Sequence, residues 1–429
     1  MKTEQGDRLF WIWLSRRLGE GSKWYPILLE RFGAPYDIFR ADDEELAALM
    51  PEMSEKDRAK LCNKSLDEAY EILSVCRRSG YSLLCYDDKR YPLSYRSLLD
   101  PPLLMYYRGT LPDFQNRLLI ALVGTRKMSE YGRRMTYKIA YELAHAGAVI
   151  VSGMARGIDG VASCAALAAK GSTVAILGSG LDVPYPPEHA GFQKILEQQA
   201  VVMTEYAPGS RPERHHFPHR NRLISGLCQG TVVIDADDRS GALLTADHAL
   251  YQGRDIFAVP ANVGDPNASG PNRLIREGVR VALCADDILN QYSLLYRHSI
   301  DATTSASLGK RSDYDGEMLA RMGVYSYTID GEKHERTTPK SNGRKQVKNE
   351  KPVTEQPKAA VQPDHSAQML ATLGERERRV FDGIPMDRPV TIDGLQVLGY
   401  NTGELLAALS MLEVMGLIQT LPGGLYCRA

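Results

Sequence analysis

The fold is decided by the stretch Leu118-Leu-Ile-Ala-Leu-Val-Gly-Thr-Arg-Lys-Met-Ser129, in which six apolar residues lead into a glycine turn and then a helix over about 131–146. An unbroken apolar run is typical of a strand that is buried on both faces. Similar short runs follow at helix-length intervals, at 148–151, 173–177, 200–204, 231–235, 255–259 and 279–283. This alternation predicts a doubly wound α/β fold, a parallel sheet covered by helices on both faces.

Glycine turns follow the first three predicted strands, as Gly124-Thr-Arg-Lys-Met-Ser129, Ser152-Gly-Met-Ala-Arg-Gly-Ile-Asp159 and Gly178-Ser-Gly180. The carboxyl ends of parallel strands meet at one edge of the sheet, where ligands of this fold bind. Glycine lets the backbone approach an anion, and a helix start offers unpaired N–H groups. The turns match neither Gly-x-Gly-x-x-Gly nor a Walker A loop, so a dinucleotide or nucleoside triphosphate gains little support.

Arginines accompany these turns. Arg126 and Arg156 lie within two of them, while a long loop brings Arg220, Asn221 and Arg222 up to the next helix. Guanidinium groups bind phosphate through two parallel hydrogen bonds. We expect Arg126, Arg156, Arg220 and Arg222 to converge in one crevice, with Arg126 and Arg222 sharing one hollow. A further helix start, at Ser240 and Gly241, should point its N–H groups into the same crevice.

Charge and cysteine usage limit the class of protein. The 429-residue chain carries a net charge of −1, so any anion site must be local rather than a uniformly basic coat. The seven cysteines form no Cys-x-x-Cys pair, and His215, His216 and His219 have no carboxylate or thiolate at ligand spacing. We therefore expect no disulfide framework, no metal and no cofactor. Without a signal-like start or a membrane-length apolar run, we expect a cytoplasmic protein with no membrane partner.

The flanking segments differ in composition. Residues 1–85 predict helices only, and Gly19-Glu-Gly21 between two of them is compatible with either a phosphate-gripping helix-hairpin-helix or a plain packing domain. The sheet domain follows over 86–297, and a basic, proline-containing tether is expected over 298–368. Residues 369–429 predict a winged helix of three helices and a hairpin. Its third helix, 402–415, has no Lys or Arg, which favours a docking or dimer module over a duplex reader.

Several motifs together resemble the DNA-processing proteins of the DprA or Smf family. They are Tyr91-Pro92, 100–109, Val123-Gly-Thr-Arg126, 152–159, Leu177-Gly-Ser-Gly-Leu-Asp182, Phe217-Pro-His-Arg-Asn-Arg222 and Ser240-Gly-Ala-Leu-Leu-Thr245. The resemblance covers about residues 85–292. It implies an extended Rossmann-like domain, a helical (SAM or helix-hairpin-helix-like) N-terminus and a winged-helix C-terminus.

The resemblance also implies a function. Such a protein binds single-stranded DNA without catalysis, acts as a homodimer, protects incoming strands and loads RecA recombinase onto strands covered by single-strand-binding protein during natural transformation. Gly124, Thr125 and Arg126 would take a backbone phosphate. The rest of the pocket would be formed by Gly153, Arg156, Gly157, Arg220, Asn221, Arg222, Ser240 and Gly241. Bases would stack on Phe217 or Tyr185. Pro187 stands where family members commonly have a basic residue, and Lys127 or Lys194 could substitute.

Two other classes remain open. A nucleotide hydrolase related to the lysine-decarboxylase-like family would need a glutamate where this chain has His248, although Asp159 and Glu205 could still act as acids or bases. A nucleotide sensor would hold a small ligand in the same crevice and use the winged helix as its reader.

Overall fold

The computed structural model describes residues 4–301, 319–320, 322–324, 374–385, 390–396, 399–400, 402–414, 417–421 and 425–428. The chain divides into two units, Met1–Thr337 and Thr338–Ala429, and each is described by itself. Among the described residues, no helix is long and apolar enough to cross a membrane.

The N-terminal segment is helical, as predicted, up to a final strand. Its helices are α1 (Glu4–Leu18), α2 (Trp24–Phe32), α3 (Pro35–Arg40), α4 (Asp43–Leu49), α5 (Glu55–Cys62) and α6 (Asp67–Ser79). The side chains of Asp42 and Ser54 accept backbone N–H groups and so begin α4 and α5. Buried Trp13 and Leu28 belong to a core that continues into the sheet domain. The prediction of helices only is wrong for the last residues of the segment, which form the first strand of the sheet.

A nine-stranded sheet forms the centre of this unit. Its strands are β1 (Ser82–Cys85), β2 (Leu104–Gly109), β3 (Leu119–Val123), β4 (Val149–Ser152), β5 (Ser172–Ile176), β6 (Val201–Thr204), β7 (Gly230–Val233), β8 (Asp255–Ala258) and β9 (Arg280–Val281), in the order β1-β2-β6-β5-β4-β3-β7-β8-β9. The seven strands from β3 to β9 are parallel and match the seven predicted runs. The sequence did not predict β1 and β2, which extend one edge antiparallel.

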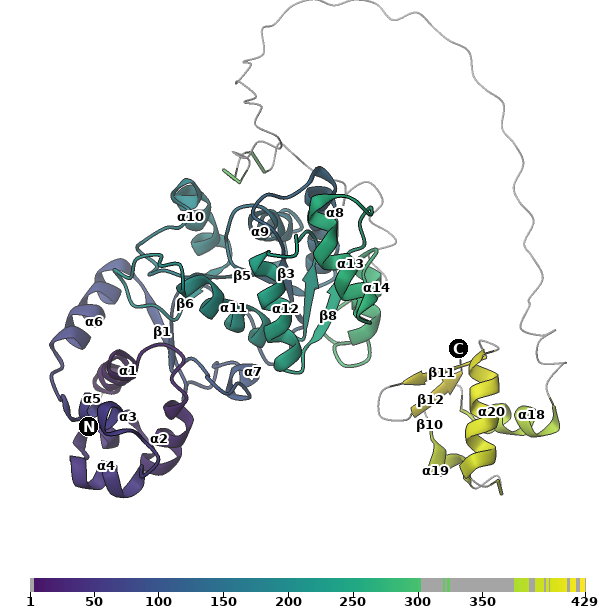
Figure 1. The fold of residues 1–429 in the computed structure, drawn as a ribbon, viewed down its shortest axis with the longest axis horizontal. Helices are drawn as coiled ribbons and strands as arrows, with labels where there is room; N and C mark the ends of the chain where they lie inside the picture. Colours follow the sequence, from purple (N-terminus) through teal and green to yellow (C-terminus); the bar gives the residue numbers. More distant parts are fainter. Residues whose placement is uncertain are drawn as a thin grey trace, which may run out of the picture. The chain divides into compact units, whose positions relative to one another are not determined.

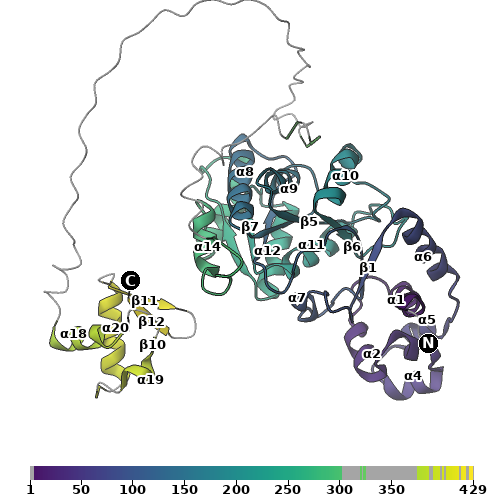
Figure 2. The same ribbon diagram turned by 180° about the vertical axis from the view of Figure 1, so that it is seen from behind.

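Helices cover both faces of the sheet, as Figures 1 and 2 show. They are α7 (Leu93–Arg96), α8 (Glu130–His145), α9 (Ile158–Ala168), α10 (Ala190–Gln199), α11 (His216–Leu227), α12 (Gly241–Tyr251), α13 (Ser269–Arg276) and α14 (Ala285–Tyr292). Alternate residues of β3 point to opposite faces: Ile120 and Leu122 pack with α8, α9 and α14, while Leu119 and Ala121 pack with α11 and α12. This two-sided burial explains the unbroken apolar run in the sequence.

The strand order reverses at β3. The chain moves outward on one side through β4, β5 and β6, and then returns to place β7, β8 and β9 on the other side of β3. The connections that leave β3 and β7 therefore run to opposite faces, which opens a crevice beyond the carboxyl ends of these two strands. The candidate site lies at this position.

The predicted tether, 298–368, lies largely outside the described residues. Its described part includes Leu319 and Val324, which are buried in the core of the first unit, with the Val324 side chain close to Gly160 of α9. The prediction of an unfolded tether is therefore wrong for these positions, because the few apolar residues here are used for packing.

The second unit has the elements of a winged helix. They are α18 (Glu375–Asp382), β10 (Val390–Thr391), α19 (Ile392–Leu395), α20 (Thr402–Val414), β11 (Ile418–Leu421) and β12 (Leu425–Arg428). The strands form a three-stranded antiparallel sheet with β12 in the middle. Its own apolar core joins Val380, Leu405, Leu409 and Ile418. The three predicted helices and the two strands of the predicted hairpin are confirmed.

Candidate nucleic-acid interface

A cavity of about 700 Å³ lies at the crevice between the connections that leave β3 and β7. Its wall is formed by the turn after β3, the start of α9, the loop before α11, one face of α11 and the start of α12. The lining residues predicted from the sequence are Gly124, Thr125, Arg126, Tyr185, Phe217, Arg220, Asn221, Ser240 and Gly241. The structure thus brings together nine of the predicted site residues.

The turn after β3 is shaped by glycine. A Cβ on Gly124 would lie 2.4 Å from the Ile158 side chain, so only glycine fits where the strand passes the start of α9. Gly157 has φ +74°, and a Cβ there would lie 2.3 Å from the carbonyl oxygen of Thr125. These two close approaches hold the turn in place, and they leave the Arg126 side chain exposed at the cavity rim.

The start of α8, in contrast, is closed by the chain's own carboxylate. The Ser129 N–H donates to Asp235 Oδ2 at 2.6 Å, and the Gly132 N–H donates to Ser129 Oγ at 2.9 Å. Burial raises the pKa of Asp235, and hydrogen bonding from Ser129 opposes the shift. The expectation that this helix start offers unpaired N–H groups to an anion is therefore wrong for Ser129 and Gly132, because the Asp235 carboxyl group accepts the first N–H and the Ser129 hydroxyl accepts the second.

The start of α12 is open. Ser240 caps the helix through its side chain, which accepts the Ala242 N–H at 3.3 Å. Gly241 is exposed, and its N–H has no acceptor in the described part of the chain. Asn221 Nδ2 donates to the Gly241 carbonyl at 3.3 Å, which ties α11 to this helix start. An anion in the cavity can therefore meet the positive end of α12.

Arg220 is a fixed cation in the cavity wall. It is buried, and its Nη1 donates to the carbonyl of Gly153, at 2.9 Å, and to that of Ile176. Asp159 lies beside it and accepts the Gly153 N–H at 3.2 Å. Burial raises the pKa of Asp159, while the Arg220 charge opposes that shift. The carbonyls at the ends of β4 and β5 thus orient this guanidinium.

Aromatic rings stand beside the cations. The Arg126 guanidinium lies 5.1 Å from the Phe217 ring centroid, and the Tyr185 ring is 5.0 Å from the Phe217 ring at 46°. The Phe217 ring also packs against Gly178, where an added Cβ would lie 3.2 Å from it. The cavity therefore offers flat apolar surfaces next to positive charge.

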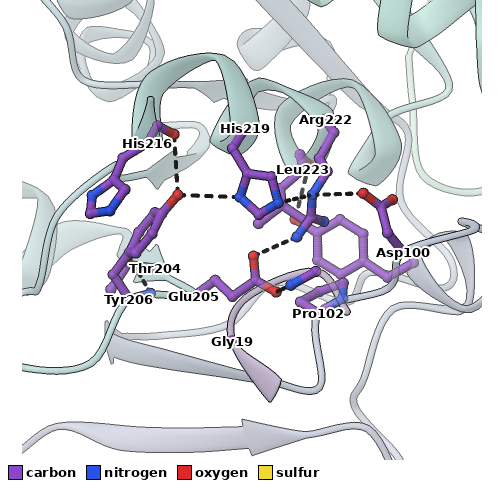
Figure 3. A network of polar contacts seen from close by, with 12 residues as sticks. Gly19, Asp100, Pro102, Thr204, Glu205, Tyr206, His216, His219, Arg222 and Leu223 are labelled. Atoms are coloured by element: carbon purple, nitrogen blue, oxygen red, sulfur yellow. Dashed lines mark hydrogen bonds and ion pairs between the residues drawn. The ribbon is translucent and has the colours of Figure 1, made fainter. Parts of the chain in front are cut away.

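Arg222 lies elsewhere, and the expectation that it shares a hollow with Arg126 is wrong. Its side chain is 3% exposed, and its guanidinium meets Glu205 at 2.5 Å and Asp100 at 3.2 Å (Figure 3). The physical reason is helical phase. Arg220 and Arg222 both lie within α11 rather than in a loop, and residues two apart on a helix point to different sides.

The same network holds the N-terminal helices against the sheet domain. Glu205 Oε1 accepts the Gly21 N–H at 3.0 Å, while Arg222 Nε donates to His219 Nε2 at 3.3 Å. Tyr206 Oη lies 3.3 Å from His219 Nδ1, which extends the network along α11 (Figure 3). The Gly21 N–H that a helix-hairpin-helix would offer to phosphate thus contacts an internal carboxylate, in agreement with the packing interpretation of the N-terminal domain.

Four other predicted residues also lie outside the cavity lining. Arg156 pairs with Glu188 at 2.5 Å. Lys127 is exposed, but its side chain does not line the cavity. Gly153 and Gly157 shape the wall through their backbones, as described above. The convergence of four arginines is therefore wrong for Arg156 as well as for Arg222.

Neither lysine suggested as a substitute at the Pro187 position, Lys127 or Lys194, lines the cavity.

The lining also contains residues that the sequence did not assign to the DNA site. They are Val123, Ala155, Asp159, Pro212, Arg214, Pro218, Ile224, Ala242, Leu244 and Thr245. Arg214 adds a third cation from the loop before α11. It could have been predicted from the sequence, because it lies in a segment rich in arginine and histidine. The apolar residues carry no such signal, because their place depends on how α11 and α12 pack together.

A carboxylate does accompany two of the histidines. Glu213 Oε2 lies 3.4 Å from His215 Nδ1, and His216 completes a group whose ligand atoms lie within 4.8 Å of one another. The statement that no carboxylate stands at ligand spacing from these histidines is therefore wrong.

Two family models and several known proteins match this chain. The family model described as DNA recombination-mediator protein A matches residues 82–293, and the DprA winged helix domain matches residues 362–424. The DNA processing protein DprA of Bacillus subtilis is 36% identical over 220 residues, which are 51% of this chain and 74% of that protein. Protein Smf of Synechocystis is 28% identical over 433 residues, which are 98% of this chain and 99% of that protein.

A solved structure agrees with the fold. The X-ray structure of DprA from Streptococcus pneumoniae superposes with a TM-score of 0.57 and 32% identity, covering 65% of this chain and 97% of that one. The fold and the cavity define a protein of the extended Rossmann class with an arginine-containing crevice at the point where the strand order reverses. The chain belongs to the DprA/Smf family of DNA-processing proteins.

Proposed function

We propose that the cavity binds single-stranded DNA by its phosphate backbone, without breaking a bond in it. Three elements supply cations to one hollow: Arg126 from the turn after β3, Arg214 from the loop before α11, and Arg220 from α11. The exposed N–H of Gly241 adds the positive end of α12. Because the whole chain has a net charge of −1, this local cluster has to supply the attraction for a polyanion.

The observation that carries the proposal is the 5.1 Å separation between the Arg126 guanidinium and the Phe217 ring at one cavity wall. A phosphate and its base are the two parts of a nucleotide that such a pair would contact. Bases stack on aromatic rings with little dependence on sequence, but only when they are unpaired. This favours a single strand over a duplex and predicts binding of mixed sequences.

The residue chemistry of the cavity favours binding rather than catalysis. Of the two carboxyl groups considered for a hydrolase, Glu205 is committed to Arg222 outside the cavity lining. Asp159 does line the cavity, but it accepts the N–H groups of Gly153 and Ala155 and lies beside Arg220, which gives it a positioning role. Incubation with nucleoside monophosphates and with labelled strands should release neither free base nor shortened DNA.

We further propose, from membership of the family and the resemblance described above, that the protein protects incoming strands and transfers them to RecA in the cytoplasm. It would act as a homodimer on DNA covered by single-strand-binding protein. Helix α20 of the winged-helix unit has no Lys or Arg, which suits a protein-docking surface better than a major-groove reader. RecA filament assembly on coated single strands should be faster with the protein than without it.

The decisive experiment is equilibrium binding of a fluorescent single-stranded oligonucleotide, followed by anisotropy at several salt concentrations. Arg126→Ala should weaken binding about tenfold or more, since hydrogen bonds to charged groups contribute about 1.5–3 kcal/mol. It should also reduce the slope of log affinity against log salt by about 0.7, the value for one phosphate of a single strand.

Arg134→Ala is the matched control, because it removes the same charge from an exposed position on α8 that does not line the cavity. Its affinity should stay close to that of the unaltered protein. Equal losses for both variants would mean that binding follows overall charge, and would contradict the assignment of the cavity.

A further inference from the structure

The loop before α11 carries a group of potential metal ligands outside the DNA proposal. Glu213 and His215 lie in this loop and His216 is the first residue of α11, and one ligand atom of each lies within 4.8 Å of the other two. Glu213 Oε2 and His215 Nδ1 are 3.4 Å apart. Ligand atoms at about 2.0–2.1 Å from a tetrahedral zinc ion are themselves separated by roughly 3.4 Å. Two of the three ligands therefore already stand at the separation that zinc requires.

The orientation of His216 is a second, independent observation. Its Nδ1 lies 3.2 Å from the carbonyl oxygen of Gly178, and its ring stacks on Tyr206 at 4.0 Å and 24°. Because a carbonyl only accepts, Nδ1 carries the proton and Nε2 keeps its lone pair. Zinc-binding histidines commonly donate their other N–H to a carbonyl in this way.

The position of the group leaves room for an ion. Glu213 and His215 are exposed, and His216 is only partly buried, so a bound ion would keep at least one place for water or another oxygen. Pro212 and Arg214, which alternate with these residues, line the cavity. An ion here would fix the loop that carries these two residues and would add positive charge beside the proposed phosphate site.

We propose that Glu213, His215 and His216 bind one zinc ion. Two imidazoles and a carboxylate form a ligand set that suits zinc, whereas magnesium and calcium prefer oxygen ligands only. The zinc site does not depend on the proposed DNA binding.

Chelator-treated full-length protein would be titrated with zinc chloride in competition with a chromophoric chelator, in the absence of DNA. We expect one equivalent to bind. Glu213→Gln and His216→Ala should each lower the affinity at least tenfold. His145→Ala serves as the matched control because it removes an exposed histidine from the end of α8, and it should leave the affinity unchanged. Circular dichroism confirms that each variant is folded.

Cobalt chloride supplies a second readout. A four-coordinate site gives visible absorption, and a site of nitrogen and oxygen ligands lacks the near-ultraviolet charge-transfer band of a cysteine thiolate. This distinguishes the group from Cys62, the exposed free cysteine among the described residues. Equal zinc affinity in all variants, a thiolate band, or affinity no greater than that of an isolated surface histidine would each overturn the proposal. If the zinc affinity is no greater than that of an isolated surface histidine, Glu213 and His215 form an ion pair and not a metal site.

Discussion

Replacing Gly21 by alanine tests how the N-terminal helices are held to the sheet domain. Gly21 has φ +65°, and a Cβ there would lie 2.5 Å from Arg222 Nη2 and 2.7 Å from His219 Nε2. The same Arg222 Nη2 donates to Glu205 at 2.5 Å, and Arg222 is 2% exposed. The guanidinium cannot move aside without loosening a buried ion pair.

Two costs add in this variant. A left-handed backbone conformation costs alanine about 1–2 kcal/mol. Removing one partner of a buried ion pair destabilises the folded protein by about 3–5 kcal/mol. In Gly21→Ala both partners remain but are pushed apart, so we expect a smaller loss of about 2 kcal/mol. We therefore expect Gly21→Ala to lower the free energy of unfolding by about 3–4 kcal/mol, measured by urea denaturation. Limited proteolysis should release the N-terminal helices earlier than in the unaltered protein.

Gly19→Ala is the matched control. Gly19 lies two residues away in the same turn with φ +80°, but a Cβ there meets nothing within 4 Å. It should show only the backbone cost of about 1–2 kcal/mol. Equal destabilisation of the two variants would refute the view that the Arg222–Glu205 pair holds the N-terminal helices.

Two further predictions concern α11. Phe217→Leu should weaken single-strand binding by about 1–3 kcal/mol in the anisotropy assay, the contribution of one stacked base, and should leave the salt slope unchanged; a changed slope with unchanged affinity at low salt would contradict stacking. Burial, together with the nearby Arg222 charge, lowers the pKa of His219 to about 4. The folded state therefore disfavours the protonated imidazole, so stability should fall as the pH drops from about 6.5 towards 4, and His219→Gln should flatten this part of a urea-denaturation pH series; an unchanged profile would show that His219 does not carry the effect.

The sequence predicted the parallel strands because a strand that is buried on both faces appears in the sequence as an unbroken apolar run. The run 118–123 is apolar throughout, and β3 occupies Leu119–Val123. Strands β1 and β2 were not predicted, although residues 104–107 of β2 are apolar too. These two strands lie on the antiparallel edge, and their pairing joins Ser82–Cys85 to residues about twenty positions further along the chain. Such pairing depends on the rest of the fold rather than on local pattern.

The residues of the site likewise divide into those that the local sequence predicts and those that depend on the rest of the fold. Residues in turns directly after strands, such as Thr125 and Arg126, were predicted correctly as cavity-lining, because parallel strands bring their carboxyl ends together. The error at Arg222 came from treating 211–222 as a loop. Helix α11 begins at His216, with Pro218 in its first turn, where proline is tolerated. Once that segment is a helix, its side chains are distributed around an axis and do not face one hollow.

This distribution gives α11 two separate tasks. Phe217, Arg220, Asn221 and Ile224 follow helical spacing along the face that lines the cavity, while His219 and Arg222 contact the network at Gly21 and Glu205. A helix is stiff over this length, so the ion pair on one side also fixes the cation and the ring on the other. Binding to a fixed surface loses less conformational entropy than binding to a mobile one. Gly21→Ala should therefore weaken single-strand binding more than Gly19→Ala does, although neither residue lines the cavity.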